Sequence, residues 1–588
     1  MDHTPTITSA TNADSPSADN RIETYDYAVN GAVVASTQNS FDSFKRVEEK
    51  VYTVGNKEYA QKMYFDRSRV TSVRDTVANT TKMNYYYYDD CNRIVRVDMG
   101  GMTTAYHYDV YGQLVREDNQ SLDMTMVYEY NNIGNLISAK KYSYTASTSS
   151  PSGTPVTTSF GYSNDKLTTF GNASIAYNSI GCPTTYEGKS LTWTKGKLSR
   201  MFSGTLATGT SSYNYTYNAF GQRVSRTYSY LPSNSSAVQI GQLTEYNKSY
   251  YYDHAGRLIS ENVSKAYYSA GSTSESIVFL YDESGIIGMA RTVGSTTNAY
   301  YFQRNLLGDV VAIYDTSGNM VAKYLYDAWG NCTISSETTN TVVANANPIR
   351  YRGYYYDDDT GLYYLNARYY SPKWRRFISP DDTAYLDPES VNGLNLYCYC
   401  NNDPVNYCDP SGHAIESPLD LISLGVGVVD VLTNPHDPLA WLGLVGDIVD
   451  LIPCVTGVGD SVRMVKLSVS MADDTHDVVR TMRKVYSSIP DTGDVSFLLK
   501  ATGSYEIVYE SGYRYIGKGG IYRSTVSALQ HLAENDTVRE IIWRSAPNTM
   551  FAFVHEYWLQ IIYKFKEGGK LFNEIWSPGR NIVAKLIK

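Results

Sequence analysis

Residue types suited to phosphodiester hydrolysis recur in one stretch near the C-terminus. Cleavage of a phosphodiester needs an activated water, a neutralised phosphate and a stabilised leaving oxygen. Arginine supplies positive charge, a carboxylate holds a divalent cation, and tyrosine or histidine moves protons. The set is Tyr505, Tyr515, Arg523, His531, Glu556 and Asn573. Each residue alone also fits an ordinary strand, helix or surface position, although together these residue types suit a nuclease site.

Short strands and amphipathic helices are expected to position these residues. The predicted elements are strands over 505–510, 513–517 and 537–544 and helices over 522–532 and 550–565. Ser511-Gly512 supplies the turn between the first two strands, so Tyr505 and Tyr515 fall on one hairpin. Glu556 lies among apolar residues of the second helix, and a carboxylate in such a setting needs a reason.

The tail from residue 501 onward resembles the GIY-YIG nuclease superfamily. Gly503-Ser504-Tyr505 stands for the first element, with Ser in place of Ile, and Tyr515-Ile516-Gly517 matches the second. The final Ser577-Pro578-Gly579-Arg580-Asn581 is similar to the end of toxin members of this group. The resemblance implies a small α/β (α+β) domain with metal-dependent endonuclease activity.

The resemblance also implies roles for the residues of the site. Glu556 would hold Mg²⁺ or another divalent cation, and Arg523 would pair with the scissile phosphate. Tyr505 would act as general base on water. Tyr515 would form a hydrogen bond to the phosphate or the water, His531 would relay protons, and Asn573 would orient the site. No small-molecule cofactor is expected.

Charge divides the chain in a way that places nucleic-acid contact in the tail. The whole chain has 51 Lys and Arg against 60 Asp and Glu, a net charge of −9, which excludes a protein that coats nucleic acid along its length. Residues 501–588 instead carry three more basic than acidic residues. Lys518, Arg544 and Arg580 are the expected contacts to backbone phosphates, with DNA favoured over RNA as substrate.

Tyrosine dominates the rest of the composition. The chain has 56 Tyr against 15 Phe, and all but eight of the tyrosines lie within residues 1–412. Many belong to a repeated unit: a strand, then Tyr-Asp or Tyr-Asn, two residues, Gly and a second strand. Copies begin at Tyr108, Tyr130, Tyr177, Tyr217, Tyr252, Tyr281, Tyr314 and Tyr326, with a degenerate copy at Tyr88 in which Asn92 replaces Gly.

This unit predicts stacked antiparallel hairpins. Asp or Asn begins the turn through its side chain, and Gly supplies the positive φ that ends it. A hairpin cannot bury a face alone, so successive copies are expected to build a continuous sheet. Tyrosine suits such a sheet because it buries its ring while its hydroxyl remains in water.

The Tyr-rich body resembles the YD-repeat, or RHS, family over about residues 80–412. The most specific segments are Tyr351-Arg-Gly-Tyr-Tyr-Tyr-Asp357, Thr360 to Tyr370, Trp374 to Asp381, and Asn401 to Gly412. They are similar to the RHS-associated core, the plug that closes the hollow β-shell of the family. The resemblance implies that the shell encloses the polypeptide that comes after the plug.

Some members of this family cut themselves just after the plug with aspartates of two Asp-Pro motifs. Asp409 matches the second motif, while Asp381 matches the first in part because Asp382 stands where Pro is expected. His413 replaces the usual apolar residue at the cut. The alternative is that both aspartates are turn and cap residues.

Composition shifts divide the chain into five regions. We expect a disordered segment at 1–24, repeats at 25–340, the plug at 341–412, an apolar helical linker at 413–494 and the nuclease-like domain at 495–588. Residues 414–470 are apolar enough for membrane contact. Asp447 and Asp450 instead favour packing inside the shell, because a carboxylate is costly to bury in lipid. The first residues lack the basic and apolar regions of a signal peptide.

These observations favour a multidomain, mainly β bacterial toxin of the RHS type. It would be secreted or surface-associated, with its C-terminal nuclease delivered to the cytoplasm of a competitor cell. A nuclease that endangers its producer implies a neutralising immunity protein, expected to be acidic. Two alternatives stay open: a non-enzymatic YD-repeat adhesion protein with an inert tail, or a toxin whose tail cleaves RNA or has decayed.

Overall fold

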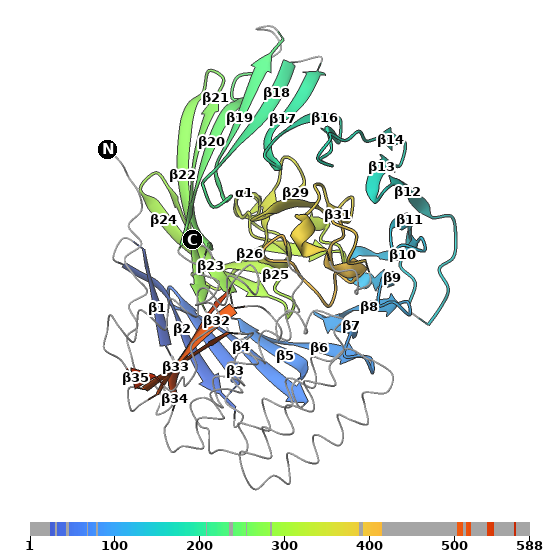
Figure 1. Ribbon diagram of the computed structural model, residues 1–588. Helices are drawn as coiled ribbons and strands as arrows, with labels where there is room; N and C mark the ends of the chain where they lie inside the picture. Colours follow the sequence, from blue (N-terminus) through green and yellow to red (C-terminus); the bar gives the residue numbers. More distant parts are fainter. Residues whose placement is uncertain are drawn as a thin grey trace, which may run out of the picture. The chain divides into compact units, whose positions relative to one another are not determined.

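The computed structural model describes two compact units, which are treated separately (Figure 1). It describes residues 24–413, apart from short gaps at 30–31, 43–45, 67–68, 78–79, 147, 207–208, 234–238, 254–255, 283–284 and 387–391. In the tail it describes 503–509, 513–518, 538–545 and 570–571. The linker expected over 413–494 lies outside the described residues from 414 onward.

The first unit is built from two long antiparallel sheets in which the strand order is the sequence order. The first sheet has β1 (Thr24–Val29), β2 (Ala32–Phe41), β3 (Val47–Val54), β4 (Lys57–Asp66), β5 (Arg69–Val77), β6 (Thr80–Tyr88), β7 (Ile94–Met99), β8 (Met102–Tyr108), β9 (Leu114–Asn119), β10 (Met124–Tyr130), β11 (Leu136–Ser143), β12 (Val156–Ser163), β13 (Lys166–Phe170) and β14 (Ala173–Ser174). The second has β15 (Thr185–Tyr186), β16 (Lys189–Thr194), β17 (Lys197–Leu206), β18 (Gly209–Tyr217), β19 (Arg223–Pro232), β20 (Leu243–Tyr252), β21 (Leu258–Tyr267), β22 (Gly271–Asp282), β23 (Gly285–Val293), β24 (Thr296–Arg304), β25 (Val310–Asp315), β26 (Met320–Tyr326) and β27 (Cys332–Ile334). The predicted stacks of antiparallel hairpins are therefore confirmed, but they form two sheets that end at β14 and begin again at β15, rather than the one continuous sheet that was expected. We call β1–β27 the wall.

The repeat turns have the chemistry that their sequence predicts. Asp109 Oδ1 accepts hydrogen bonds from the backbone N–H of Tyr111 and Gln113, both at 2.9 Å, and Gly112 has φ of +81°. In the degenerate copy Asn92 takes φ of +64°, which Asn tolerates better than most residues. A turn at Asn305 uses the same bonds, although its sequence lacks the tyrosine that marks the other copies.

The repeat tyrosines do not keep their hydroxyls in water, so that expectation was wrong. Each hydroxyl of a recurring set donates to a backbone carbonyl near the start of an earlier strand. The pairs are Tyr88 to Val70, Tyr108 to Ile94, Tyr130 to Leu114, Tyr177 to Leu167, Tyr217 to Leu198, Tyr252 to Arg223, Tyr281 to Leu258 and Tyr326 to Val310. The donor–acceptor distances lie between 2.7 and 3.0 Å. We call this contact the tyrosine staple.

Side chains, rather than a strand ladder, join the beginning of the wall to its later strands. Strands β3 and β4 pack on β22–β25 through a second apolar cluster, in which the rings of Tyr59 and Tyr301 stack 4.4 Å apart. Lys50 Nζ lies 3.0 Å from Asp282 Oδ2, and Tyr52 donates to the same oxygen at 3.2 Å. Both charged side chains are almost fully buried, so the seam depends on their pairing.

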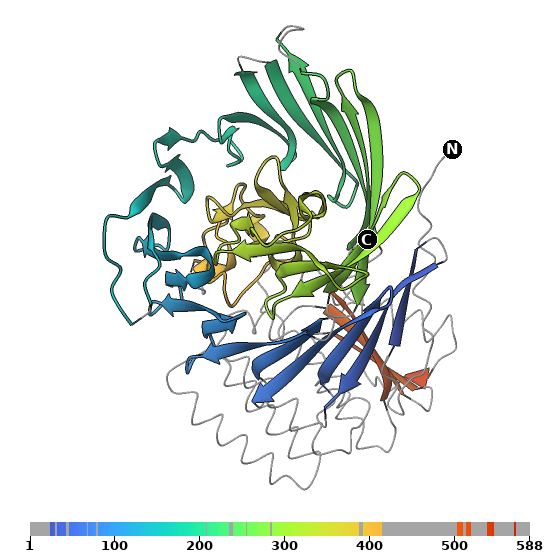
Figure 2. The ribbon, with the colours of Figure 1, turned by 180° about the vertical axis from the view of Figure 1, so that it is seen from behind.

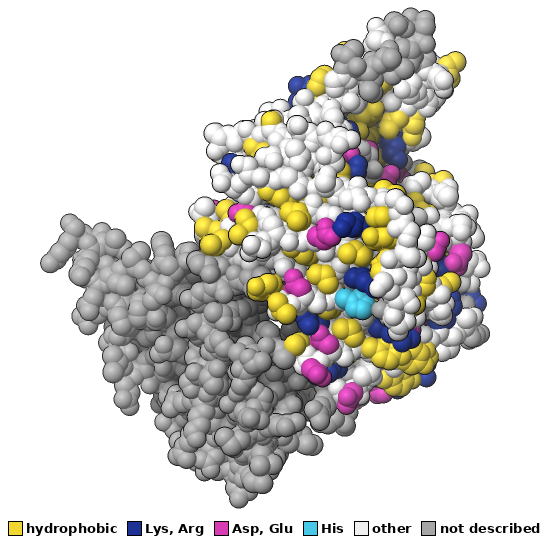
Figure 3. All heavy atoms as spheres, turned by 90° about the vertical axis from the view of Figure 1, so that its right-hand side faces the viewer, with side chains coloured by type: hydrophobic (Ala, Val, Ile, Leu, Met, Phe, Trp, Pro, Cys, Tyr) yellow, Lys and Arg dark blue, Asp and Glu magenta, His cyan; other side chains and the backbone are white. Residues whose placement is uncertain are grey.

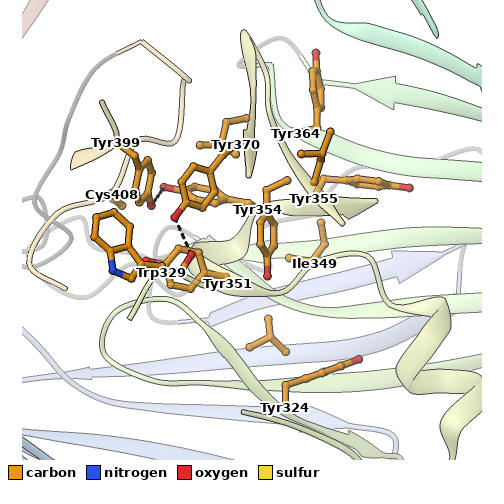
Figure 4. Packing of buried hydrophobic residues seen from close by; sticks show 14 of the residues in the cluster. Tyr324, Trp329, Ile349, Tyr351, Tyr354, Tyr355, Tyr364, Tyr370, Tyr399 and Cys408 are labelled. Atoms are coloured by element: carbon orange, nitrogen blue, oxygen red, sulfur yellow. Dashed lines mark hydrogen bonds between the residues drawn. The ribbon is translucent and has the colours of Figure 1, made fainter. Parts of the chain in front are cut away.

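The plug lies within the curve of the wall, as both ribbon views show (Figure 1, Figure 2). It contains α1 (Thr341–Ala346), β28 (Tyr355–Asp357), β29 (Leu362–Leu365), β30 (Arg368–Ser371), β31 (Arg376–Phe377) and short 3-10 turns at Tyr351–Gly353, Thr383–Tyr385 and Cys400–Asn402. Its centre is a cluster of buried rings (Figure 4), in which Tyr370 donates to the Trp329 carbonyl at 2.7 Å and the Tyr354 and Tyr399 hydroxyls meet at 3.1 Å.

Buried ion pairs fasten the plug to the wall. Arg223 and Arg226 of β19 both bind Asp357 of the plug, at 2.6 and 3.1 Å, and these side chains are at most 2% exposed. The Arg223 guanidinium also lies within 5 Å of the ring centres of Tyr250, Tyr355 and Tyr364. Cation–π contact and pairing together offset the cost of taking the charges out of water.

The second unit contains the tail strands. These are β32 (Gly503–Tyr509), β33 (Tyr513–Lys518), β34 (Val538–Ser545) and β35 (Lys570–Leu571). Their order in the sheet is β34-β32-β33-β35, with β33 and β35 parallel and the other pairs antiparallel. The three predicted strands are confirmed, whereas the predicted helices over 522–532 and 550–565 lie outside the described residues.

Removing one staple should weaken the wall measurably. Tyr130→Phe leaves the Leu114 carbonyl without the hydroxyl donor that reaches it at 2.8 Å. We expect a loss of about 1 to 3 kcal/mol in unfolding free energy, measured by urea denaturation of the full chain. Tyr111→Phe is the control, because Tyr111 is 67% exposed at a turn tip. Equal stability of the two variants would contradict the role of the staple.

Candidate functional site

The two tail tyrosines are on adjacent strands of one hairpin. Tyr505 on β32 pairs with Gly517 on β33, and Tyr515 on β33 pairs with Ile507 on β32. The tyrosine positions are therefore two residues apart in register. This is the arrangement that the spacing of the two elements predicts.

Two of the expected phosphate contacts share one row across the tail sheet. Ser504 pairs with Lys518 on one side and with Arg544 on the other. This row is one residue out of register with the row of Tyr505, Gly517 and Trp543. Because alternate positions of a strand belong to opposite faces, the register assigns the basic row and the tyrosine row to different faces of the sheet.

The other expected tail residues lie outside the described residues, and their roles stay predictions. They are Arg523, His531, Glu556, Asn573 and Arg580. Glu556 is the residue expected to bind Mg²⁺, so the expected metal site also lies outside the described residues. The segment 414–470, considered for membrane contact, lies there as well. In the part of the chain that is described, no helix has the length and apolar character needed to cross a membrane.

The described chain leaves the plug through a junction built on Asp409. Its Oδ1 accepts from the backbone N–H of Gly412 at 2.7 Å and of His413 at 3.0 Å. Its own N–H donates to the Tyr354 hydroxyl at 2.7 Å, so the aspartate is anchored to the buried rings of the plug. Burial raises the pKa of Asp409, while Arg368 acts in the opposite direction.

Arg368 brings the two candidate self-cleavage aspartates together. Its Nη2 lies 2.8 Å from Asp381 Oδ2 and 3.3 Å from Asp409 Oδ2, and these side chains are at most 7% exposed. Burial lowers the pKa of Arg368, with both carboxylates opposing that shift. The guanidinium carbon stands 3.6 Å from the ring centre of Phe377, which fixes the plane of the group.

Three consecutive residues of the plug hold three consecutive carbonyls of the junction. Asn366 Nδ2 donates to the Pro410 carbonyl at 3.2 Å, the Ala367 N–H to Ser411 at 3.2 Å and Arg368 Nε to Gly412 at 2.5 Å. We call residues 366–368 the clamp. It fixes residues 410–412 at the turn between β29 and β30.

His413 completes the cluster on the side where the described segment ends. Its Nδ1 lies 2.5 Å from Asp381 Oδ1, and its ring stacks on Tyr385 with centres 4.7 Å apart. Sequence reasoning identified the two aspartates but missed Arg368 and the contact of His413. The clamp residues Asn366, Ala367 and Arg368 lie within a plug motif that the sequence analysis identified. Nothing in the spacing of that motif indicates that Arg368 pairs with Asp409, 41 residues later.

The cluster contains the groups needed to hydrolyse a peptide bond. A guanidinium donor touches the carbonyl of the Gly412–His413 peptide, and a carboxylate accepts from its N–H. One carboxyl can activate water, the other can protonate the leaving nitrogen, and the guanidinium can stabilise the oxyanion. The same bonds also form a turn cap, so both interpretations of the aspartates fit and cleavage stays a prediction.

On the face of the molecule seen in Figure 3, the described side chains do not form a nucleic-acid-binding surface. There, basic and acidic side chains are interspersed among apolar and uncharged ones. Several wall arginines are paired with nearby carboxylates, such as Arg93 with Asp89 and Arg96 with Asp98, each at 2.7 Å. This face therefore lacks the basic stripe that tracks a phosphate backbone.

Comparison with known proteins identifies the wall and plug. Residues 157–405 match the family model of the teneurin YD-shell. The chain is 31% identical over 340 residues to the tRNA3(Ser)-specific nuclease WapA of Bacillus spizizenii, and 36% identical over 119 residues to the double-stranded DNA deaminase toxin A of Burkholderia cenocepacia. These matches cover 57% and 20% of this chain, but only 13% and 8% of those relatives.

A solved structure agrees on the fold. The crystal structure of TcdB2–TccC3 superimposes with a TM-score of 0.52 at 18% sequence identity, covering 66% of this chain and 22% of that one. The aligned part of the chain therefore shares the fold of that structure, and the family match over residues 157–405 supports the predicted YD-repeat shell. These matches do not show that the tail belongs to the GIY-YIG superfamily, which stays a prediction.

Gly412 should tolerate no side chain at the junction. A Cβ there would stand 2.2 Å from the Leu365 carbonyl oxygen and 3.1 Å from the Arg368 nitrogen, at φ of +75°. Gly412→Ala should therefore displace the junction from the clamp and increase amide hydrogen exchange of residues 405–413 at least tenfold. Gly188→Ala is the control, because Gly188 has the same φ with nothing within 4 Å of a Cβ. Unchanged exchange at 405–413 would contradict the close packing.

Proposed function

We propose that this chain is the shell, plug and C-terminal effector of an RHS-type polymorphic toxin whose effector is a metal-dependent endonuclease. The observation that carries the proposal is the cluster at the end of the plug, where Arg368 and Asp409 contact the backbone of residues 412–413 and Asp381 contacts Arg368 and the His413 ring. Such a cluster at this point separates a carrier from its cargo. The relatives named as nuclease and deaminase toxins support a shell whose C-terminal activity varies.

Processing would be hydrolysis of a peptide bond of His413. Asp381 takes a proton from water, the resulting hydroxide adds to the carbonyl carbon, and Arg368 stabilises the oxyanion. Asp409 donates its proton to the leaving nitrogen as the carbon–nitrogen bond breaks, and burial favours the protonated form needed for this step. The products are a new carboxyl end on the plug and a new amino end on the tail.

Nuclease activity is assigned to the tail. Tyr505 would act as base on the attacking water, while Arg523 stabilises the charge of the phosphate in the transition state. Tyr515, His531 and Asn573 would bind and orient the phosphate and relay protons. Glu556 would hold the divalent cation, which polarises the phosphate when bound. The Tyr505–Tyr515 hairpin supports this assignment through its register.

The expected substrate is nucleic acid, and the expected partner is an immunity protein. DNA is favoured by the resemblance to GIY-YIG endonucleases, whereas relatives named for tRNA cleavage favour RNA. Both polymers therefore belong in the test of activity. Delivery would be to the cytoplasm of a target cell after secretion or from the cell surface. Lys518 and Arg544, on one row of the tail sheet, would contact backbone phosphates.

Self-processing predicts a defined fragment. The full chain, purified and incubated at neutral pH, should yield a tail whose first residue mass spectrometry places at His413. Asp409→Asn and Asp381→Asn should each slow this at least a hundredfold, because each removes a proton-transfer group. Asp358→Asn is the control, since Asp358 is 63% exposed in the same plug. A wild-type chain that stays intact would reject the processing step.

Nuclease activity predicts metal-dependent cutting of one polymer. The full chain, before and after processing, should degrade plasmid DNA or total RNA with Mg²⁺ and not with chelator. Glu556→Ala and Arg523→Ala should each reduce the rate at least a hundredfold, with Glu567→Ala as a carboxylate control from the same tail. Cutting that survives Glu556→Ala would reject the site. No cutting, together with binding to cell surfaces, would favour the adhesion protein.

A further inference from the structure

A lysine of the wall contacts the clamp at the alanine that also contacts the junction. Lys197 opens β17, directly after the β16–β17 turn, and its Nζ donates to the Ala367 carbonyl at 2.9 Å. The N–H of the same alanine donates to Ser411 of the junction. Ala367 therefore stands between a wall lysine and the segment that holds His413. The lysine and the alanine are separated by 170 residues of sequence.

The Lys197 contact acts on the peptide group that also belongs to Arg368. The carbonyl of Ala367 and the nitrogen of Arg368 share one planar peptide unit. Holding that carbonyl fixes the orientation of the backbone from which the Arg368 side chain extends. The same arginine reaches Asp381, Asp409 and the Gly412 carbonyl, so a small rotation of the peptide would move all three contacts.

Neighbouring groups hold the Lys197 side chain in place. Its Cε and Nζ pass 3.4 Å from where a Cβ on Gly221 would stand, so the turn at Gly221 leaves room for the lysine. Burial lowers the pKa of Lys197, and Arg368 lowers it further, while Asp381 opposes the shift. A buried ammonium close to a guanidinium is unfavourable by itself, which makes the carbonyl acceptor and the nearby carboxylate necessary.

We propose that Lys197 is a positioning residue for self-processing, through which the wall aligns the clamp and so licenses cleavage at His413. The inference rests on the self-processing proposed above. Because Lys197 belongs to the wall and its acceptor to the plug, the cluster reaches its working geometry only when the β16–β17 hairpin lies on the plug. Cleavage would then come after completion of the shell rather than after synthesis of the plug alone.

The test compares charge removal with charge conservation at one position. In the full chain, Lys197→Met should slow the appearance of the tail fragment at least tenfold, whereas Lys197→Arg, which keeps a cationic donor, should recover at least half of the wild-type rate. Lys195→Met is the matched control, because Lys195 is exposed in the same turn. All variants should keep the melting temperature of the wild type. A wild-type rate in Lys197→Met, or no recovery by Lys197→Arg, would overturn the inference.

A second readout separates this inference from the processing proposal. In the Asp409→Asn background no cleavage is expected, and amide exchange of the Leu365–Arg368 and Ser411–His413 segments is measured instead. Adding Lys197→Met should increase exchange in both segments severalfold, and adding Lys195→Met should not. If the wild-type chain stays intact but this increase is seen, processing has failed and the positioning contact stands. If the wild-type chain is cleaved and exchange is unchanged, the positioning role is rejected.

Discussion

A hydrogen bond from a tyrosine hydroxyl to the carbonyl of an earlier strand joins each stapled hairpin of the wall to its neighbour. The strand ladder alone fixes how adjacent strands pair, but it does not fix how far each hairpin tilts over the previous one. The staple adds a third point of contact, for example from Tyr130 to Leu114 and from Tyr217 to Leu198. Phenylalanine would fill the same space and leave the carbonyl without a donor. The staples therefore contribute to the excess of tyrosine, 56 residues, over phenylalanine, 15 residues.

The wall and the plug depend on each other because each carries buried groups that only the other can satisfy. Arg223 and Arg226 would be unpaired charges inside the wall without Asp357 and Asp359 of the plug. On the plug, Asn402 donates to the Gly134 carbonyl and Tyr397 to the Gly181 carbonyl, both carbonyls of repeat turns. The clamp and the Lys197 contact extend this dependence to the junction. The chemistry proposed at His413 is thus a local result of how completely the two parts have come together.

Sequence reasoning predicted what is encoded locally and missed what is encoded at a distance. The turns were predicted because Asp109 and Gly112 carry the whole signal within four residues. The turn at Asn305 was missed because it lacks the tyrosine, although its bonds are the same. Asp381 and Asp409 were identified from a motif, whereas Arg368 and Lys197 act through partners far along the chain. In the tail, the spacing predicted that Tyr505 and Tyr515 lie on one hairpin, but only the pairing reveals their register and that Lys518 and Arg544 share a row.

The way in which the junction is held has a consequence for the evolution of the gene. Within the described residues, the groups that hold residues 409–413 come from Tyr354, the clamp, Asp381, Tyr385 and the junction itself. None of these contacts requires a particular amino acid after position 413. A recombination event that joined a different coding sequence at this point would leave every one of them unchanged. A different sequence could therefore follow position 413 without loss of these described contacts, while the wall and plug remain under the constraint of their mutual fit.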